Sequence, residues 1–187
     1  MSDLTSEVTP ETVLRNYFHA KDENRPHILT SVFTPDAELL VVNHSSNIAF
    51  PARTVGREAI GDVLVRQFAQ MYENVYSFYL QRPPLDRKEF SCGWLVVMSD
   101  KQSKCAPVGC GRYDWKFSSE SPCLATHLTI TIYAMPVLLA EELSAVIEWV
   151  EKLSYPWISA QDAANLIPKS DLLKPVLQYL TDCAQGG

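Results

Sequence analysis

The segment VGCGRYDWKF at residues 108–117, together with LATHLTITIYAM at residues 124–135, carries most of the information about the fold. Both segments are rich in β-branched and aromatic residues and alternate with a period of two, which is typical of β-strands. In the first segment the alternation places Tyr113, Trp115 and Phe117 on one face and charged side chains on the other. We therefore expect two long strands, each with one apolar and one polar face.

Two shorter segments, residues 75–80 and 92–98, have the same character, and stretches rich in proline or small polar residues separate the four segments. Their order predicts four sequential antiparallel strands. Strands this long must bend to enclose a core, and a glycine inside a strand marks a position where a bulge can form. Such glycines are Gly93, Gly109 and Gly111. We therefore predict a strongly bent sheet.

Helical periodicity surrounds these strands. Residues 9–20 begin with an N-cap and a first-turn proline and continue with apolar residues at helical spacing. A shorter helix follows and ends near Pro35, a hairpin is predicted over residues 37–50, and a third helix begins at Gly56. Residues 138–187 are helical again. The whole pattern predicts an α+β domain with a C-terminal helical extension packed on it.

Three short motifs accompany this order of elements: YFHAKD at residues 17–22, FTPDA at residues 33–37 and GREAI at residues 56–60. Over about residues 9–136 the chain resembles the nuclear transport factor two-like superfamily, which includes SnoaL-like polyketide cyclases, ketosteroid isomerase and scytalone dehydratase. The resemblance implies a cone-shaped domain, here residues 9–137, whose bent antiparallel sheet and N-terminal helices enclose a cavity. It also implies a homodimer formed through the convex face. A fold alone does not assign a function.

The alternation puts the aromatic residues on the concave face, so we predict a mainly apolar pocket. The residues predicted to contact a ligand are Tyr17, Trp94, Tyr113, Trp115 and Phe117. The alternative is that these aromatic side chains are simply core. No cofactor is predicted, and no metal site either, because the four histidines lack paired spacing with acids or cysteines.

The catalytic candidates are His19 and Tyr17. Resemblance to scytalone dehydratase-like enzymes places a tyrosine–aspartate pair at Phe18 and His19, where an imidazole could still act as acid or base near neutral pH. The alternative for His19 is a polar position at the end of the first helix, which the helix dipole favours. Ketosteroid isomerase-like activity is not expected, since the same matching places its base at Val41 and its tyrosine at Leu14.

Composition and charge indicate which classes of partner and which cellular location to expect. The net charge of −6, with no cluster of Lys and Arg, argues against nucleic acid. No apolar run approaches the roughly 18 to 20 residues that cross a bilayer, and the N-terminal residues do not have the pattern of a secretory signal. The 5 cysteines are scattered without a CxxC pair. This pattern fits reduced thiols, so a cytoplasmic location is expected.

Three functions remain open at this point. The leading hypothesis is cofactor-independent binding of a small apolar, cyclic ligand. The first alternative is a cofactor-free lyase or isomerase that uses His19 with Tyr17 or Tyr113, and the second is a dimeric structural or interaction module. The extension carries Trp149 and Trp157, and we expect it to cover the mouth of the cone, to cover the edge of the sheet, or to form a peripheral cap.

Overall fold

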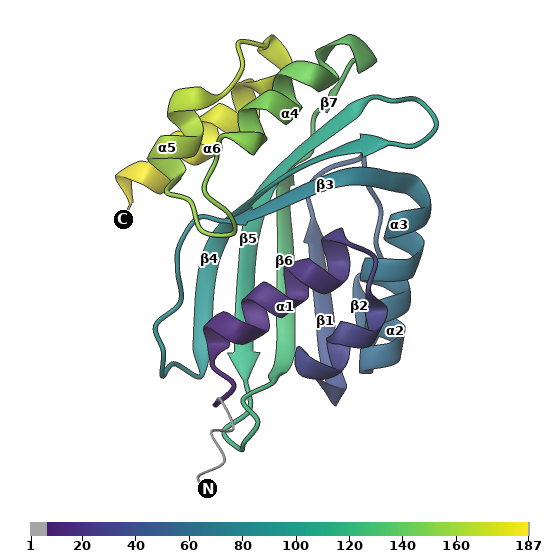
Figure 1. Ribbon diagram of the computed structural model, residues 1–187, viewed down its shortest axis with the longest axis vertical. Helices are drawn as coiled ribbons and strands as arrows, with labels where there is room; N and C mark the ends of the chain where they lie inside the picture. Colours follow the sequence, from purple (N-terminus) through teal and green to yellow (C-terminus); the bar gives the residue numbers. More distant parts are fainter. Residues whose placement is uncertain (1–6, 187) are drawn as a thin grey trace, which may run out of the picture.

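The computed structural model describes residues 7–186, and its central feature is a curved sheet with helices on both faces (Figure 1). The seven strands are β1 (Phe33–Asn43), β2 (Arg53–Val55), β3 (Tyr72–Tyr79), β4 (Glu89–Asp100), β5 (Ala106–Phe117), β6 (Ala125–Ala134) and β7 (Val137–Leu138). Their order in the sheet is β2-β1-β6-β5-β4-β3, and β7 pairs with β5. The four long strands predicted from the sequence are β3 to β6, so this part of the prediction is confirmed.

The sheet is mixed rather than wholly antiparallel. Strands β3 to β6 pair antiparallel in sequential order, but β1 pairs with β6 in parallel. The predicted hairpin also differs, because the antiparallel partner of β1 is Arg53–Val55 and residues 48–50 lie in a loop. The pairing of β1 with a strand far along the chain follows from tertiary packing, which the local pattern does not report.

Of the three glycines predicted to allow a bulge, only Gly111 lies at a register shift, whereas Gly93 and Gly109 are regularly paired between β4 and β5. The register between β5 and β6 shifts between Cys110 and Gly111. Gly111 has no room for a side chain, because a Cβ there would lie 1.9 Å from the carbonyl oxygen of Thr131 and 2.7 Å from the Trp94 indole. The missing side chain therefore lets β6 approach closely and lets the Trp94 ring lie over the backbone of β5.

Three helical segments cover the concave face, two before β1 and one after β2. Helix α1 (Pro10–Asp22) starts at the N-cap Thr9, whose hydroxyl accepts from the backbone N–H of Thr12, and crosses the sheet (Figure 1). The second segment is a 3-10 helix at Pro26–Ser31. The third consists of α2 (Arg57–Gly61), a π-helical turn (Asp62–Gln67) and α3 (Phe68–Met71) in continuous sequence. A π turn inside a helix is often found beside a functional site.

The two faces of the sheet separate as the alternation predicts. On β5, Tyr113, Trp115 and Phe117 are buried, whereas Arg112 and Lys116 are exposed. The buried set packs with α1 and the third helical segment in one apolar cluster. The concave face thus forms the main core of the domain.

The extension packs on the outer face of the sheet, opposite α1. Its helices are α4 (Leu143–Glu151), α5 (Ala160–Leu166) and α6 (Lys174–Gln185), and short 3-10 turns at Ala140–Glu142 and Asp171–Leu173 lead directly into α4 and α6. They gather at one end of the sheet (Figure 1) and form a second apolar cluster with the outward side chains of β3, β4 and β5. No residue of the extension is among those that line the cavity in the core.

The alternative expectation, that the extension covers the edge of the sheet, is correct for one short segment. The N–H of Tyr79 in the edge strand β3 donates to the carbonyl of Pro156 at 2.8 Å, and the N–H of Ile158 donates to the carbonyl of Tyr79 at 3.0 Å. The predicted boundary between residues 137 and 138 falls inside β7, so the extension begins as part of the sheet.

Candidate functional site

A small cavity of about 50 Å³ lies inside the main core, between α1, the third helical segment and the concave face. Three of the predicted ligand-contact residues line it, namely Tyr17, Trp94 and Tyr113. Most of the remaining wall is aliphatic or aromatic, and Lys21 also contributes. Since a water molecule occupies about 30 Å³ of the liquid, the cavity accommodates water or a group of a few atoms in this conformation.

The other two predicted contact residues lie deeper in the core. Trp115 stacks between Phe33 and Phe117, with ring centroids 6.1 Å away on each side, and is 1% exposed. Neither Trp115 nor Phe117 is among the cavity-lining residues. Their position matches the alternative that these rings are core.

The structure does not bring His19 to the cavity. Its side chain is 42% exposed on α1, and Nδ1 lies 2.8 Å from Oε1 of Glu23. Its Nε2 lies 3.3 Å from a guanidinium nitrogen of Arg25. This geometry matches the alternative of a surface histidine at the end of the helix.

Lys21 and Asp22 form a buried ion pair that the sequence analysis did not assign to the site. The side chains are 7% and 6% exposed, and Lys21 Nζ lies 2.5 Å from Asp22 Oδ1. The hydroxyl of Ser77 accepts from Lys21 Nζ and donates to Asp22 Oδ1, both at 2.9 Å. Asp22 Oδ2 accepts the backbone N–H of Ser77 at 3.1 Å. Every charged atom of the pair therefore has a partner.

The electrostatics of this pair are dominated by burial. Burial raises the pKa of Asp22, and the charge of Lys21 opposes that shift. A signal for Lys21 was present in the sequence, because it follows Leu14 by seven positions and Tyr17 by four and so shares their helix face. A lysine is usually exposed to solvent, but the spacing of Lys21 predicted a buried position.

Two buried polar atoms at the cavity have no hydrogen-bond partner among the described residues. They are the hydroxyl of Tyr17 and Nε1 of Trp94. Burial, followed by the charge of Asp22, raises the pKa of Tyr17 far above its ordinary value. Burial also raises the pKa of Tyr113, with the neighbouring Tyr17 as the next cause. Both phenols are therefore protonated at neutral pH.

One wall of the cavity is a loop between β1 and β2 that contributes Ile48 and Phe50. Side-chain amides hold this loop: Asn43 donates to the carbonyl of Ile48 at 2.7 Å, and Asn47 donates to the carbonyl of Met135 at 2.8 Å. Met135 itself lines the cavity. The wall is thus built from a loop and flexible side chains rather than from a rigid element.

Within residues 7–186 there is no group of three or more His, Cys, Asp or Glu side chains placed to hold a metal ion. In the same range, no helix combines the length and the apolarity needed to cross a bilayer.

These features define a class: a cone-shaped α+β domain with a cavity in its core and an outer helical layer. No family model matches the chain, and no curated protein matches it. Solved structures do share its fold. A hypothetical protein with a ketosteroid isomerase-like fold from Catenulispora acidiphila, determined in complex with trimethylamine, has a TM-score of 0.51 at 19% identity, over 66% of this chain and 85% of that one.

Two further solved structures agree. A nuclear transport factor 2-like superfamily protein from Salmonella enterica serovar Typhimurium has a TM-score of 0.53 at 11% identity, covering 66% of this chain and 88% of that one. A type 2 hexachlorocyclohexane dehydrochlorinase has a TM-score of 0.53 at 14% identity, covering 67% and 84%. The chain therefore has the nuclear transport factor 2-like fold, as the resemblance implied. Identities this low establish the fold alone.

Proposed function

We propose that this domain binds a small apolar, cyclic ligand in the core cavity without a cofactor. The observation that carries the proposal is the position of Lys21, a charged side chain 7% exposed, at the wall of a cavity lined mainly by apolar residues. Lysine is almost never fully buried unless it is paired. A core that served packing alone has no need for a charge beside a void, whereas a pocket uses a few polar groups to orient its ligand.

The size of the cavity sets a condition on this proposal. An apolar cavity of about 150 Å³ holds a benzene ring, so a ring fits here only if the wall moves. Met98 and Met135 both line the cavity, and methionine adapts readily to a change in shape. The loop that carries Ile48 and Phe50 is the other movable part of the wall. We expect binding to displace these groups.

The test is the melting temperature of the full chain in a panel of small apolar cyclic compounds, with and without a cavity-filling change. Val96→Met adds volume at the cavity and should abolish the rise produced by a binding compound. Val97→Met makes the same change on the same strand, in the cluster beneath the extension. This control should lower the melting temperature of the free protein, but a binding compound should still raise it. A panel that leaves the unmodified chain unchanged would contradict the proposal.

A cofactor-free lyase or isomerase is the second candidate, and Lys21 is again the observation that favours it. A buried cation near protonated phenols is suited to stabilise negative charge that develops on a substrate oxygen. His19 lies outside the cavity, so in this version of the proposal Tyr17 and Lys21 stabilise the substrate oxygen, and a water molecule in the cavity takes the α proton. Exchange of the α protons of cyclic ketones in D₂O, followed by NMR, measures the activity. Exchange at the buffer rate would exclude it for that class of compound.

We also propose that the protein forms a homodimer, does not bind nucleic acid and is cytoplasmic. A homodimer through the convex face would use the part of that face that the extension leaves open, where His127 and Lys116 are exposed. Light scattering at increasing concentration tests this. The negative net charge supports the absence of nucleic acid, and the 5 free cysteines support a reducing, cytoplasmic setting.

A further inference from the structure

We infer that the ligand of the core cavity carries a hydrogen-bond acceptor, such as a carbonyl oxygen, and that amines are disfavoured. This inference rests on the proposed binding function and adds the chemical class of the ligand. It follows from which polar atoms reach the cavity and from the charge that Lys21 places there.

The polar groups at the cavity are predominantly donors. Among the described residues that line it, the polar side chains are Tyr17, Lys21, Trp94 and Tyr113. An indole N–H and an ammonium group can only donate, and a phenol donates through its proton. The Tyr17 hydroxyl and the Trp94 N–H have no partner within residues 7–186. A buried donor without a partner is costly, so a ligand that supplies an acceptor gains that free energy on binding.

The side chain of Lys21 occupies the position that a cationic ligand would use. Its Nζ lies 5.1 Å from the ring centroid of Phe68 and 5.7 Å from that of Phe18. Cations bind aromatic faces within about 6 Å of the centroid. An ammonium ligand would therefore meet a like charge at the same aromatic wall.

The carboxylate of Asp22 does not make the cavity favourable for a cationic ligand. Its two oxygens are already taken by Lys21 and by the hydroxyl and backbone N–H of Ser77. Asp22 is also absent from the residues that line the cavity. A cationic ligand thus has no free carboxylate to pair with at this site, whereas the remaining donor capacity of Lys21 faces an acceptor favourably.

The experiment measures dissociation constants by NMR for cyclopentane, cyclopentanone and cyclopentylamine, which share one ring. Trp94→Phe and Tyr17→Phe each remove one unpartnered donor and keep an aromatic ring. Each should lower the affinity for cyclopentanone by about tenfold relative to the affinity for cyclopentane. For the unmodified protein, cyclopentylamine in its ammonium form should bind at least about tenfold more weakly than cyclopentanone.

A matched control is Trp115→Phe. The Trp115 N–H is equally buried and has no partner among the described residues, but Trp115 does not line the cavity. This variant should leave all three constants unchanged, and melting temperatures will report whether each variant is folded.

The outcomes separate the two proposals. The inference about acceptors is overturned if the Trp94 and Tyr17 variants lower the affinity for cyclopentane and cyclopentanone equally. It is also overturned if cyclopentylamine binds as tightly as cyclopentanone. In both cases ligand binding itself stands. If the unmodified protein binds none of the three rings, the proposed function fails and the inference fails with it.

Discussion

The carboxylate of Asp22 accepts the backbone N–H of Ser77 at 3.1 Å, and 55 positions separate the two residues in the chain. Ser77 belongs to β3, the edge strand of the sheet, so Asp22 takes the place of a neighbouring strand there. Two positions further along, the segment at Pro156 to Ile158 does the same for Tyr79. An uncovered edge strand invites pairing with another chain. The end of α1 and the extension together close this edge.

Asp22→Asn should be strongly destabilising. It leaves Lys21 buried without its counter-ion, and breaking a buried pair from one side costs about 3 to 5 kcal/mol. Urea unfolding measures the loss. The double variant Lys21→Met with Asp22→Asn removes both charges and should recover a large part of it. A single variant that lost less than about 1 kcal/mol would contradict the description of a desolvated pair.

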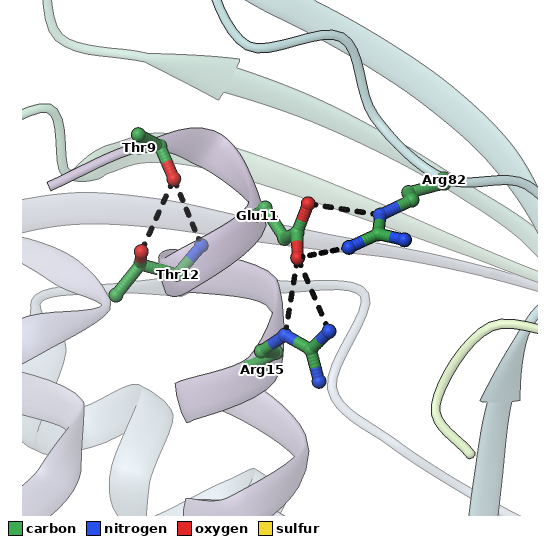
Figure 2. Close-up of polar contacts among 5 residues, drawn as sticks. All are labelled: Thr9, Glu11, Thr12, Arg15 and Arg82. Atoms are coloured by element: carbon green, nitrogen blue, oxygen red, sulfur yellow. Dashed lines mark hydrogen bonds and ion pairs between the residues drawn. The ribbon is translucent and has the colours of Figure 1, made fainter.

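Glu11→Gln should reduce stability by about 1 kcal/mol at neutral pH. Arg82 donates to both carboxylate oxygens of Glu11, at 2.7 and 2.9 Å, and Arg15 donates to one of them (Figure 2). The hydrogen bonds from Arg82 are the main reason why the pKa of Glu11 lies below its ordinary value of 4.5. A lowered folded-state pKa gives stability that is complete above 4.5 and is lost as the pH falls through the folded value.

Urea unfolding at a series of pH values checks this sign, because the difference between the two proteins should disappear at acid pH. Glu58→Gln is the control. Its partner Arg66 is 3.8 Å away and Glu58 is 80% exposed, so little change is expected at any pH. A difference that grew on acidification would mean that the sign is wrong.

Gly111→Ala should prevent normal folding or cost more than about 3 kcal/mol. The new Cβ would lie 1.9 Å from the Thr131 carbonyl oxygen, which is backbone of the neighbouring strand and cannot move alone. Gly93→Ala is the milder comparison, since its Cβ would meet the ends of the Leu80 and Tyr179 side chains at 2.8 and 2.9 Å. Circular dichroism and thermal unfolding rank the two variants. Equal losses would show that the close approach at Gly111 is not special.

Trp149→Ala should cost about 3 to 5 kcal/mol and make the protein prone to aggregation. Trp149 is 2% exposed beneath the extension, and its indole donates to the carbonyl of Ala163 at 3.1 Å. Its loss uncovers apolar side chains on the outer face of the sheet. Tyr155→Ala, at a side chain 54% exposed, should change little. Deleting residues 138–187 should reduce solubility further, and unchanged solubility and stability would contradict the role given to the extension.

The sequence predicted the sheet well because alternation is a local property. Tyr113 and Trp115 are buried and Arg112 is exposed because neighbouring side chains on a strand point to opposite faces. The parallel pairing of β1 with β6 was missed, since no local pattern distinguishes it from an antiparallel partner. Gly111 was informative because a missing Cβ is visible in the sequence, whereas Gly93 and Gly109 mark no bulge between β4 and β5.

The site was harder to predict, because one position along a helix decides between core and solvent. Tyr17 and Lys21 face the cavity, whereas His19, two positions from each, turns to the surface. The chemistry of the imidazole favoured His19 as the cavity residue, whereas the helical spacing favoured Lys21. Burial of Lys21 also depends on Ser77, whose hydroxyl accepts a hydrogen bond from Nζ. Ser77 lies on β3, far along the chain, so the helical spacing within α1 cannot reveal this contact.

The rings of Phe18, Tyr79 and Trp157 form a continuous stack from the core to the surface. Phe18 and Tyr79 are parallel with centroids 3.8 Å apart, and Tyr79 and Trp157 follow at 5.1 Å. Arg15 and Arg82 lie over the outer ring, at 5.3 and 5.9 Å. A shift of α1 on filling the cavity would pass through this stack to a half-buried indole. Fluorescence of Trp157, which the extension supplies, would report such a shift.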